Sequence, residues 1–368
     1  MKLQRTQKRN NRNFLLLAKK GYDNFKMMKE LSVMGQQPFS DQQFDDIFAE
    51  KSAEINKQLE QEILIAMIGD VNAGKSSTIN RLMDGEVAKV GAKPGETTAI
   101  EKYSLHDKIT FVDTPGLDDI KSENSQQTLA YFKEADIILF FLNAAGSVLS
   151  ETELKTLKTL HEVNSNILIV LNKIDAADDI PTLVKYVQDH TMYNYPVIPI
   201  SSRTGENMAM LQEKILAILE TEKKDVLMAS YMADKSTTAN RWILASGASA
   251  AAIGAIPIPG ADFGPLTALQ VGMMIKLSKL YDKPITKDRA KEMIIATIVG
   301  NIGRTVFRQI VKIVPGAGSV AGASVAGAMT VSLGYAIKYA YERNINLDPN
   351  ELKPLYDMFL KEQKNKKK

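Results

Sequence analysis

Residues 69–76 combine two glycines, a lysine and a serine in a spacing that suits the binding of phosphate groups. They read GDVNAGKS and match the pattern G-x-x-x-x-G-K-[ST] between an apolar run and a helical pattern. Glycines let backbone N–H groups approach phosphate oxygens, and the helix start adds partial positive charge. We expect Lys75 to reach the β- and γ-phosphates and the Ser76 hydroxyl to bind Mg²⁺. The residues predicted to contact the phosphates are Asn72, Ala73, Gly74, Lys75, Ser76 and Ser77.

A second motif, Asp-Thr-Pro-Gly, ends the aliphatic run at residues 109–112. Asp113 is placed to hold Mg²⁺ through a water molecule. The N–H group of Gly116 is placed to contact the γ-phosphate. This motif therefore predicts the part of a nucleoside triphosphate site that binds Mg²⁺ and the γ-phosphate.

A third motif, Asn-Lys-Ile-Asp at residues 172–175, favours guanine as the base. The Asp175 carboxylate can accept hydrogen bonds from N1–H and from the exocyclic amine of guanine, whereas adenine would leave a buried carboxylate unmatched. The aliphatic stem of Lys173 can lie along the base. In the loop at residues 201–205, Ser-Ser-Arg-Thr-Gly, a backbone N–H can meet the guanine oxygen. The predicted base-binding residues are Asn172, Lys173, Asp175, Ser201 and Ser202.

Short aliphatic runs place these motifs in a sheet, because each motif directly follows one run. Such runs indicate strands buried on both faces of a mostly parallel sheet. They lie at residues 63–68, 109–112, 137–142, 167–171 and 197–200. Helical patterns separate them at residues 75–83, 125–133, 151–163, 181–190 and 206–221. The alternation predicts a doubly wound α/β domain, in which ligands bind at the carboxyl ends of the strands.

The four motifs together resemble the small-GTPase superfamily, and within it the bacterial branch of Era and the tRNA-modification GTPases. Three features indicate that branch: the sequence Gly-Glu-Thr-Thr at residues 95–98, Pro94 before it, and Asn72 in the phosphate loop. The resemblance implies a P-loop domain with a mostly parallel six-stranded sheet that hydrolyses GTP to GDP and phosphate. It implies that Thr98 binds Mg²⁺ with Ser76 and Asp113. The residues implied in catalysis are Lys75, Thr98 and Gly116.

Leu117 stands where Ras-like enzymes place a glutamine that orients the attacking water. A leucine cannot hydrogen-bond that water, so catalysis needs another source of charge and positioning. The resemblance suggests a potassium ion at Asn72, or a homodimer through the GTP-binding domain. The alternatives are that Asn72 only hydrogen-bonds within its loop, and that the protein is a nucleotide-binding scaffold with very slow hydrolysis.

Composition limits the remaining classes of function. The chain has 368 residues and no cysteine, which excludes disulfides, thiolate metal sites and thiol nucleophiles. Residues 1–60 carry a net charge of +3, residues 61–224 carry −8, and residues 225–368 carry +8. The basic ends favour contact with phosphate, either of lipid head groups or of RNA, with plain solubility as the alternative.

We expect four segments along the chain. Residues 1–61 form a basic arm and a helical extension, with a helix at residues 14–32 and a second helix that starts at a capping box of Ser40 and Gln43. Residues 62–224 form the GTP-binding domain. Residues 225–347 form an all-helical, Gly/Ala-rich domain, and residues 348–368 form a terminal helix and basic tail. The short apolar run near the N-terminus does not suit a signal peptide, so we expect a cytoplasmic location.

The C-terminal domain contains two uncharged stretches at residues 242–261 and 313–337, rich in Gly, Ala and Ser. Three interpretations stay open: contact with a membrane, a tightly packed helical bundle, and an RNA-binding domain. Residues 300–303, Gly-Asn-Ile-Gly, resemble the loop of KH domains, although their surroundings favour a helix. Asp262 is interpreted as a helix N-cap or a buried polar contact. Three motifs stand out in this region: IPIPGAD at residues 256–262, LQVGMM at 269–274 and VPGAG at 314–318. With them, residues 248–343 resemble a helical domain that is fused to some bacterial GTPases and linked to membranes.

The sequence therefore predicts a GTP-dependent switch whose helical domain binds an anionic membrane surface, as a peripheral protein at the inner face, or another partner. The switch elements would be Thr98 and residues 113–119, which the γ-phosphate orders. The alternative is an RNA- or ribosome-associated assembly GTPase of the Era type, which the sequence favours less.

Overall fold

The computed structural model of the chain describes residues 39–83, 101–105, 107–114, 125–191, 195–254, 263–298, 318–348, 351, 354–355 and 358–359. Contacts divide the chain into two compact units. Residues 57–238 form the sheet unit, and residues 1–56 with 239–368 form the helical unit. These limits differ from the four expected segments, whose boundaries stay a prediction.

The sheet unit is built on six strands in the order β2-β3-β1-β4-β5-β6. They are β1 (Ile63–Gly69), β2 (Glu101–Leu105), β3 (Ile109–Asp113), β4 (Ile137–Asn143), β5 (Ile167–Asn172) and β6 (Val197–Pro199). All neighbours are parallel except β2, which is antiparallel to β3. Ile65 of the central strand β1 is paired with Phe111 on one side and Ile137 on the other. This register aligns the carboxyl ends of the parallel strands at one edge of the sheet.

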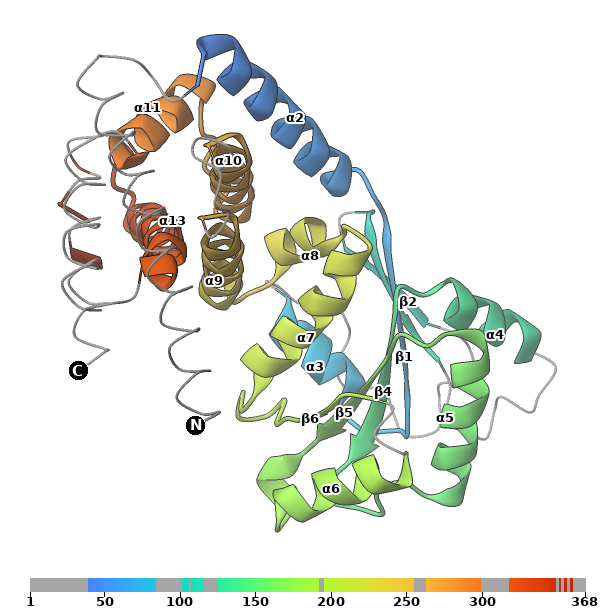
Figure 1. The fold of residues 1–368 in the computed structure, drawn as a ribbon. Helices are drawn as coiled ribbons and strands as arrows, with labels where there is room; N and C mark the ends of the chain where they lie inside the picture. Colours follow the sequence, from blue (N-terminus) through green and yellow to red (C-terminus); the bar gives the residue numbers. More distant parts are fainter. Residues whose placement is uncertain are drawn as a thin grey trace, which may run out of the picture. The chain divides into compact units, whose positions relative to one another are not determined.

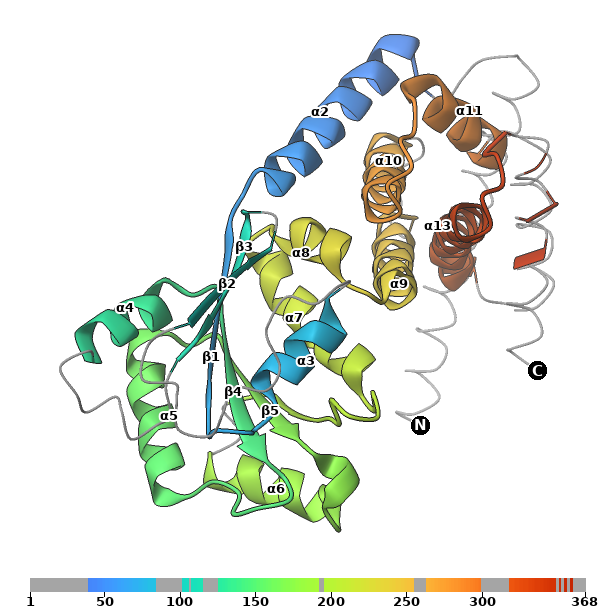
Figure 2. The same ribbon diagram turned by 180° about the vertical axis from the view of Figure 1, so that it is seen from behind.

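Helices cover both faces of this sheet (Figures 1 and 2). Helices α4 (Ser125–Glu134), α5 (Glu151–Val163) and α6 (Ile180–His190) lie on one face. Helices α3 (Lys75–Leu82), α7 (Met208–Thr221) and α8 (Asp225–Tyr231) lie on the other. Successive side chains of a strand point to opposite faces of the sheet. Because helices cover both faces, the side chains on both must be apolar. Ala66 and Ile68 accordingly pack with Phe132 in the first layer.

The doubly wound sheet expected from the aliphatic runs is confirmed. The predicted strands and helices appear in their order, with ends shifted by no more than a residue or two. Besides the short 3-10 helix at Ile174–Ala176, two elements of the sheet unit had no predicted range of their own. Strand β2 reads Glu-Lys-Tyr-Ser-Leu and lies at the sheet edge, where burial on both faces is not required. Helix α8 begins at Asp225, directly after the expected end of the domain.

The described helices of the helical unit are α2 (Asp41–Leu59), α9 (Lys235–Gly254), α10 (Phe263–Leu280), α11 (Lys287–Ile298) and α13 (Gly318–Glu342), of which α2 and α9 cross the limit between the two units. The capping box predicted at the start of α2 is confirmed. The Gln43 N–H donates to Ser40 Oγ at 3.1 Å, and the Ser40 N–H donates to Gln43 Oε1 at 2.9 Å. The expected helix at residues 14–32, Asp262 and residues 300–303 lie outside the described residues.

Helix α2 joins this unit although Asp45 of α2 and its partner Lys287 of α11 lie 242 positions apart in the sequence. Lys287 Nζ and Lys291 Nζ of α11 lie 2.7 Å from the carboxylates of Asp45 and Asp41. Exposed ion pairs of this kind contribute little stability, so they mainly orient the helix. Burial is the larger contribution, because Phe44 is fully buried and stacks on Phe48.

Glycines allow α9 and α13 to cross closely. A Cβ at Gly247 would overlap Val331, and a Cβ at Gly327 would lie 2.9 Å from the Gly247 carbonyl oxygen. A Cβ at Gly334 would lie 2.7 Å from Ile243. The small residues of the two uncharged stretches therefore bring helices of this chain together. None of the described helices combines the length and the apolar character that a membrane span needs.

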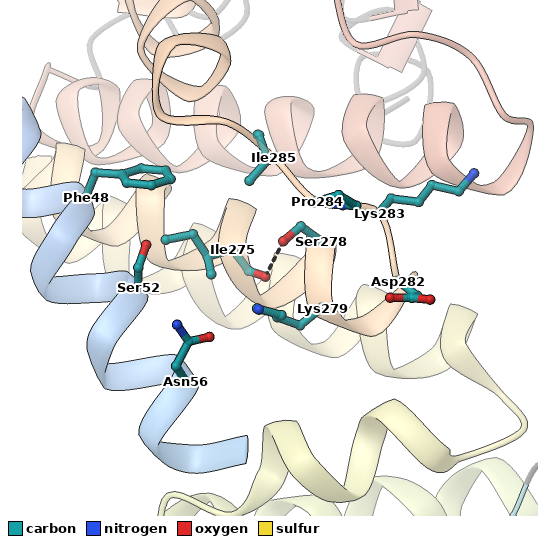
Figure 3. A pocket seen from close by; sticks show the side chains of 10 residues that line it. All are labelled: Phe48, Ser52, Asn56, Ile275, Ser278, Lys279, Asp282, Lys283, Pro284 and Ile285. Atoms are coloured by element: carbon teal, nitrogen blue, oxygen red, sulfur yellow. Dashed lines mark hydrogen bonds between the residues drawn. The ribbon is translucent and has the colours of Figure 1, made fainter. Parts of the chain in front are cut away.

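A groove of about 250 Å³ lies between α2 and α10 within the helical unit (Figure 3). Phe48 and Ile275 form part of its apolar wall, whereas Ser52 and Asn56 of α2 face it with polar groups. The Lys279 side chain extends toward this groove from α10. The Ser278 hydroxyl, which also lines the groove, donates to the Ile275 carbonyl at 2.9 Å.

The close crossing predicts the effect of Gly247→Ala. Overpacking should lower the free energy of unfolding of the helical unit by about 1–3 kcal/mol. Gly264→Ala is the matched control, because a Cβ there meets nothing within 4 Å and alanine favours helix by up to about 1 kcal/mol. The buried Trp242 is the only tryptophan and lies in this unit, so its fluorescence in urea follows this unit alone. Equal stability of the two variants would contradict the close crossing.

Candidate functional site

The phosphate loop follows β1 and ends where α3 begins at Lys75. Three of its residues have left-handed or related backbone conformations: Gly69 with φ 149°, Asn72 with φ 66° and Gly74 with φ 92°. Glycine is required at 74 for a second reason, because a Cβ there would overlap the Asn172 side chain. These conformations direct the chain from the loop to the N-terminus of α3, where backbone N–H groups can bind phosphate.

Lys75 lies across this loop. Its ammonium group donates to the carbonyl oxygens of Gly69 at 2.8 Å and of Asp70 at 3.3 Å. It also lies 3.6 Å from Asp113 Oδ1, and both side chains are about one-tenth exposed. The structure thus brings together the predicted phosphate lysine and the predicted metal carboxylate from the ends of β1 and β3.

The donors near Asp113 fit a magnesium ion. Mg²⁺ is bound by oxygen, often through one or two carboxylates together with phosphate oxygens and waters. Asp113 ends β3 beside β1, and Ser76 is the second residue of α3, which follows the loop after β1, so one carboxylate and one hydroxyl are supplied. The next residue, Thr114, is fixed to β1 because its N–H and its hydroxyl both donate to the Met67 carbonyl, at 3.1 and 3.0 Å.

Asn172 connects the phosphate loop to the predicted base loop. Its side chain is fully buried. The amino group donates to the Ala73 carbonyl at 2.8 Å and to Ser202 Oγ at 3.2 Å. The amide oxygen accepts a hydrogen bond from the Ser202 N–H at 3.0 Å. Asn172 therefore connects the two loops, and its predicted contact with the base stays a prediction.

Asp175 lies at the base subsite, in the short helix η2 (Ile174–Ala176) after β5. The Ser201 hydroxyl donates to its Oδ1 at 2.5 Å, and the Arg203 guanidinium forms an ion pair with its Oδ2. The hydrogen bond from Ser201 is the main reason that the pKa of Asp175 lies below its usual value, and the charge of Arg203 lowers that pKa further. The carboxylate therefore stays ionised, which is the form that accepts hydrogen bonds from guanine.

Arg81 holds the base loop, and sequence reasoning missed this role. Its guanidinium extends from the end of α3 and donates to the carbonyl oxygens of Ser202, Arg203 and Thr204 at 3.0–3.3 Å. Gly205, with φ 90°, leaves room for this guanidinium, because a Cβ there would lie 2.5 Å from it. One helix thus begins at the phosphate loop and ends at the anchor of the base loop.

Several predicted residues stay predictions. Thr98, Gly116 and Leu117 lie outside the described residues. Ser76 and Ser77 lie in the first turn of α3, and Lys173 lies between β5 and η2 with a left-handed backbone at φ 66°. Their contacts with a nucleotide remain expectations, as does a potassium site at Asn72.

Comparison with known proteins agrees with this geometry. Residues 64–173 match a family model described as 50S ribosome-binding GTPase. The chain is 32% identical over 165 residues to GTPase Era of Caldanaerobacter subterraneus subsp. tengcongensis, covering 42% of this chain and 54% of Era. It is 31% identical over 193 residues to GTPase Der of Nautilia profundicola, covering 49% and 40% of the two chains. It is 29% identical over 168 residues to the probable GTP-binding protein EngB of Thermotoga maritima, covering 42% and 86%.

Residues 64–173 therefore match a GTPase family model, and this part of the chain is similar to the bacterial GTPases Era, Der, EngB and the tRNA-modification GTPases. The match spans about half the length of the Era relative and less of the Der relative. It falls on the sheet unit and leaves α10, α11 and α13 outside the family model.

The contacts of Arg81 predict the effect of Arg81→Ala. Losing three charge-assisted hydrogen bonds should loosen residues 201–205 and raise the Kd for GDP about tenfold, a cost of about 1.4 kcal/mol. The Kd of Arg81→Lys for GDP should lie between those of the wild type and Arg81→Ala, because an ammonium group lacks the planar fork with which a guanidinium reaches three carbonyls. Titration with a fluorescent GDP analogue measures this, and thermal unfolding controls for folding. Unchanged affinity in the alanine variant would show that Arg81 does not position the base loop.

Proposed function

We propose that this protein hydrolyses GTP to GDP and phosphate, and that its nucleotide state controls how the helical unit binds a membrane or another partner. The observation that carries the GTPase part is the joining of the phosphate loop, Asp113 and the base loop by Lys75 and Asn172. Family membership of the domain supports the same activity. The membrane role is supported by the charge of +8 in residues 225–368.

The proposed roles follow from the chemistry of phosphoryl transfer, in which positioning and electrostatics lower the barrier. Lys75 and the backbone N–H groups of the phosphate loop bind the phosphate oxygens. Ser76, Asp113 and Thr98 would hold Mg²⁺, which would supply positive charge to the phosphate groups. The Gly116 N–H contacts the γ-phosphate. Water attacks the γ-phosphorus, and GDP leaves with the bridging oxygen.

Water positioning needs a source other than Leu117. We propose a potassium ion held by Asn72, whose left-handed backbone lies in the phosphate loop. A homodimer through the GTP-binding domain is the alternative source of charge.

The base specificity can be reversed by one substitution. In Asp175→Asn the amide oxygen can still accept from N1–H, and the amide nitrogen repels the exocyclic amine of guanine but can donate to the second carbonyl of xanthine. We expect affinity for GTP to fall about a hundredfold and hydrolysis of XTP to appear. Turnover assays of the full chain measure both.

A wild-type protein that does not hydrolyse GTP would contradict the proposed activity. A variant that keeps its preference for GTP would contradict the role of Asp175. The wild-type assay is run in potassium and in sodium, and equal turnover in the two salts would contradict the role of Asn72.

The connections of the chain support a nucleotide-dependent switch. Helix α2 ends at Leu59, whose carbonyl accepts a hydrogen bond from Lys108 Nζ at 2.7 Å, and β1 starts four residues later. At the other end, Met83 and Met232 form a β-bridge, and the Ala233 N–H donates to the Leu82 carbonyl at 3.1 Å. Both links to the helical unit therefore adjoin the strand or the helix that carries the phosphate loop.

Flotation with vesicles tests the switch. We expect the full chain to float with anionic vesicles, and to a different extent with GDP and with a non-hydrolysable GTP analogue. Neutral vesicles and Lys75→Ala, which should remove the nucleotide effect, are the controls. Failure to float in both nucleotide states at physiological salt would contradict the membrane role. Sedimentation that is sensitive to RNase would then favour the alternative, an RNA-associated assembly GTPase.

A further inference from the structure

Both oxygens of the Asp175 carboxylate are engaged by the base loop. Oδ1 accepts from the Ser201 hydroxyl, and Oδ2 is paired with the Arg203 guanidinium. Ser201 is fully buried and is itself fixed, because its Oγ accepts from the Thr204 N–H at 3.0 Å and its carbonyl accepts from the Gly205 N–H at 2.8 Å. The Ser201 contact is therefore a permanent part of the loop.

The Arg203 contact differs in its freedom to move. Its side chain is 74% exposed, whereas that of Asp175 is 10% exposed. The Arg203 backbone is held by Arg81, which donates to its carbonyl at 3.1 Å. The guanidinium can therefore leave Asp175 by rotating side-chain bonds into solvent, while the loop that carries it stays in place.

We propose that Arg203 competes with the guanine base for Asp175 Oδ2, so that it weakens nucleotide binding and speeds nucleotide release. This inference rests on the proposed function of Asp175 in reading guanine. Guanine offers two neutral N–H donors to the carboxylate, and one of them needs the oxygen that Arg203 occupies. Arg203 returns to Asp175 when the nucleotide leaves and stabilises the carboxylate in the free protein. The ion pair of Asp175 and Arg203 therefore lowers the net free energy gained when the protein binds the guanine base.

The size of the effect follows from the exposure of the pair. Ion pairs with one solvent-exposed partner are usually worth less than about 1 kcal/mol, which corresponds to no more than about fivefold in affinity. Arg203→Gln should therefore lower the Kd for GDP about two- to fivefold and slow its dissociation by a similar factor. Stopped-flow displacement of a fluorescent GDP analogue from the full chain measures both quantities. The advantage of the variant should shrink between 50 mM and 500 mM salt, because salt screens the exposed pair.

Lys185→Gln is the matched control. Lys185 is 71% exposed and pairs with Asp189 on α6, so this variant removes an exposed cation of the same unit without touching the base loop. Its affinity for GDP should equal that of the wild type. Thermal unfolding of each variant shows whether the fold is intact.

A double-mutant cycle tests whether the effect passes through Asp175. In Asp175→Asn, measured with XDP, the carboxylate that Arg203 pairs with is gone, so adding Arg203→Gln should leave the Kd unchanged. Weaker GDP binding in the single variant would show that Arg203 contacts the bound nucleotide, and unchanged binding would show that it does not compete. Either result, or an equal gain for XDP in the double variant, overturns the proposal. If the wild type binds no guanine nucleotide, the proposed function fails instead.

Discussion

The buried amide of Asn172 sets the distance between the two ends of the nucleotide site. It bonds to the carbonyl of Ala73 in the phosphate loop and to both the N–H and the hydroxyl of Ser202 in the base loop. A side chain lacking either amide group would leave a buried backbone group unsatisfied, at a cost of about 1–3 kcal/mol. Because Asn172 ends β5 and is paired with Asn143 of β4, the register of the sheet determines where this amide lies. Strand pairing therefore determines the spacing between the phosphate loop and the base loop.

The position of the Asn172 amide also explains the identity of neighbouring residues that have no catalytic role. Gly74 has a left-handed φ and also faces the Asn172 side chain, so two independent requirements exclude a larger residue there. Arg81 adds a second connection between the same loops, since it reaches from α3 to three carbonyls of the base loop. Two polar side chains, Asn172 of the sheet and Arg81 of α3, therefore hold the phosphate and base subsites together.

The sequence predicted what short local patterns encode. Aliphatic runs gave the buried strands, the phosphate loop gave the start of α3, and Ser40 with Gln43 gave the cap of α2. It did not show Arg81, because an arginine at the end of an ordinary helix has no local signal, and its partners lie more than 120 residues further on. The grouping of α2 with α10 and α11 was missed for the same reason: ion pairs such as Asp45–Lys287 join residues 242 positions apart. The polar strand β2 lacks the aliphatic run that identified the others.

Helix α3 connects the phosphate loop with the residues at which α9 begins. The helix has 8 residues, so its length is about 12 Å, and a helix this short moves as one body. Its first residue, Lys75, contacts the loop that binds phosphate, and its last, Leu82, accepts a hydrogen bond from Ala233, two residues before α9 begins. Gln212 of α7 fixes the same junction by donating to the Asp234 carbonyl and to Thr238 Oγ1. The first residues of α9 are thus held by both α3 and α7, and the proposed switch would need the two nucleotide states to differ in how they strain this junction.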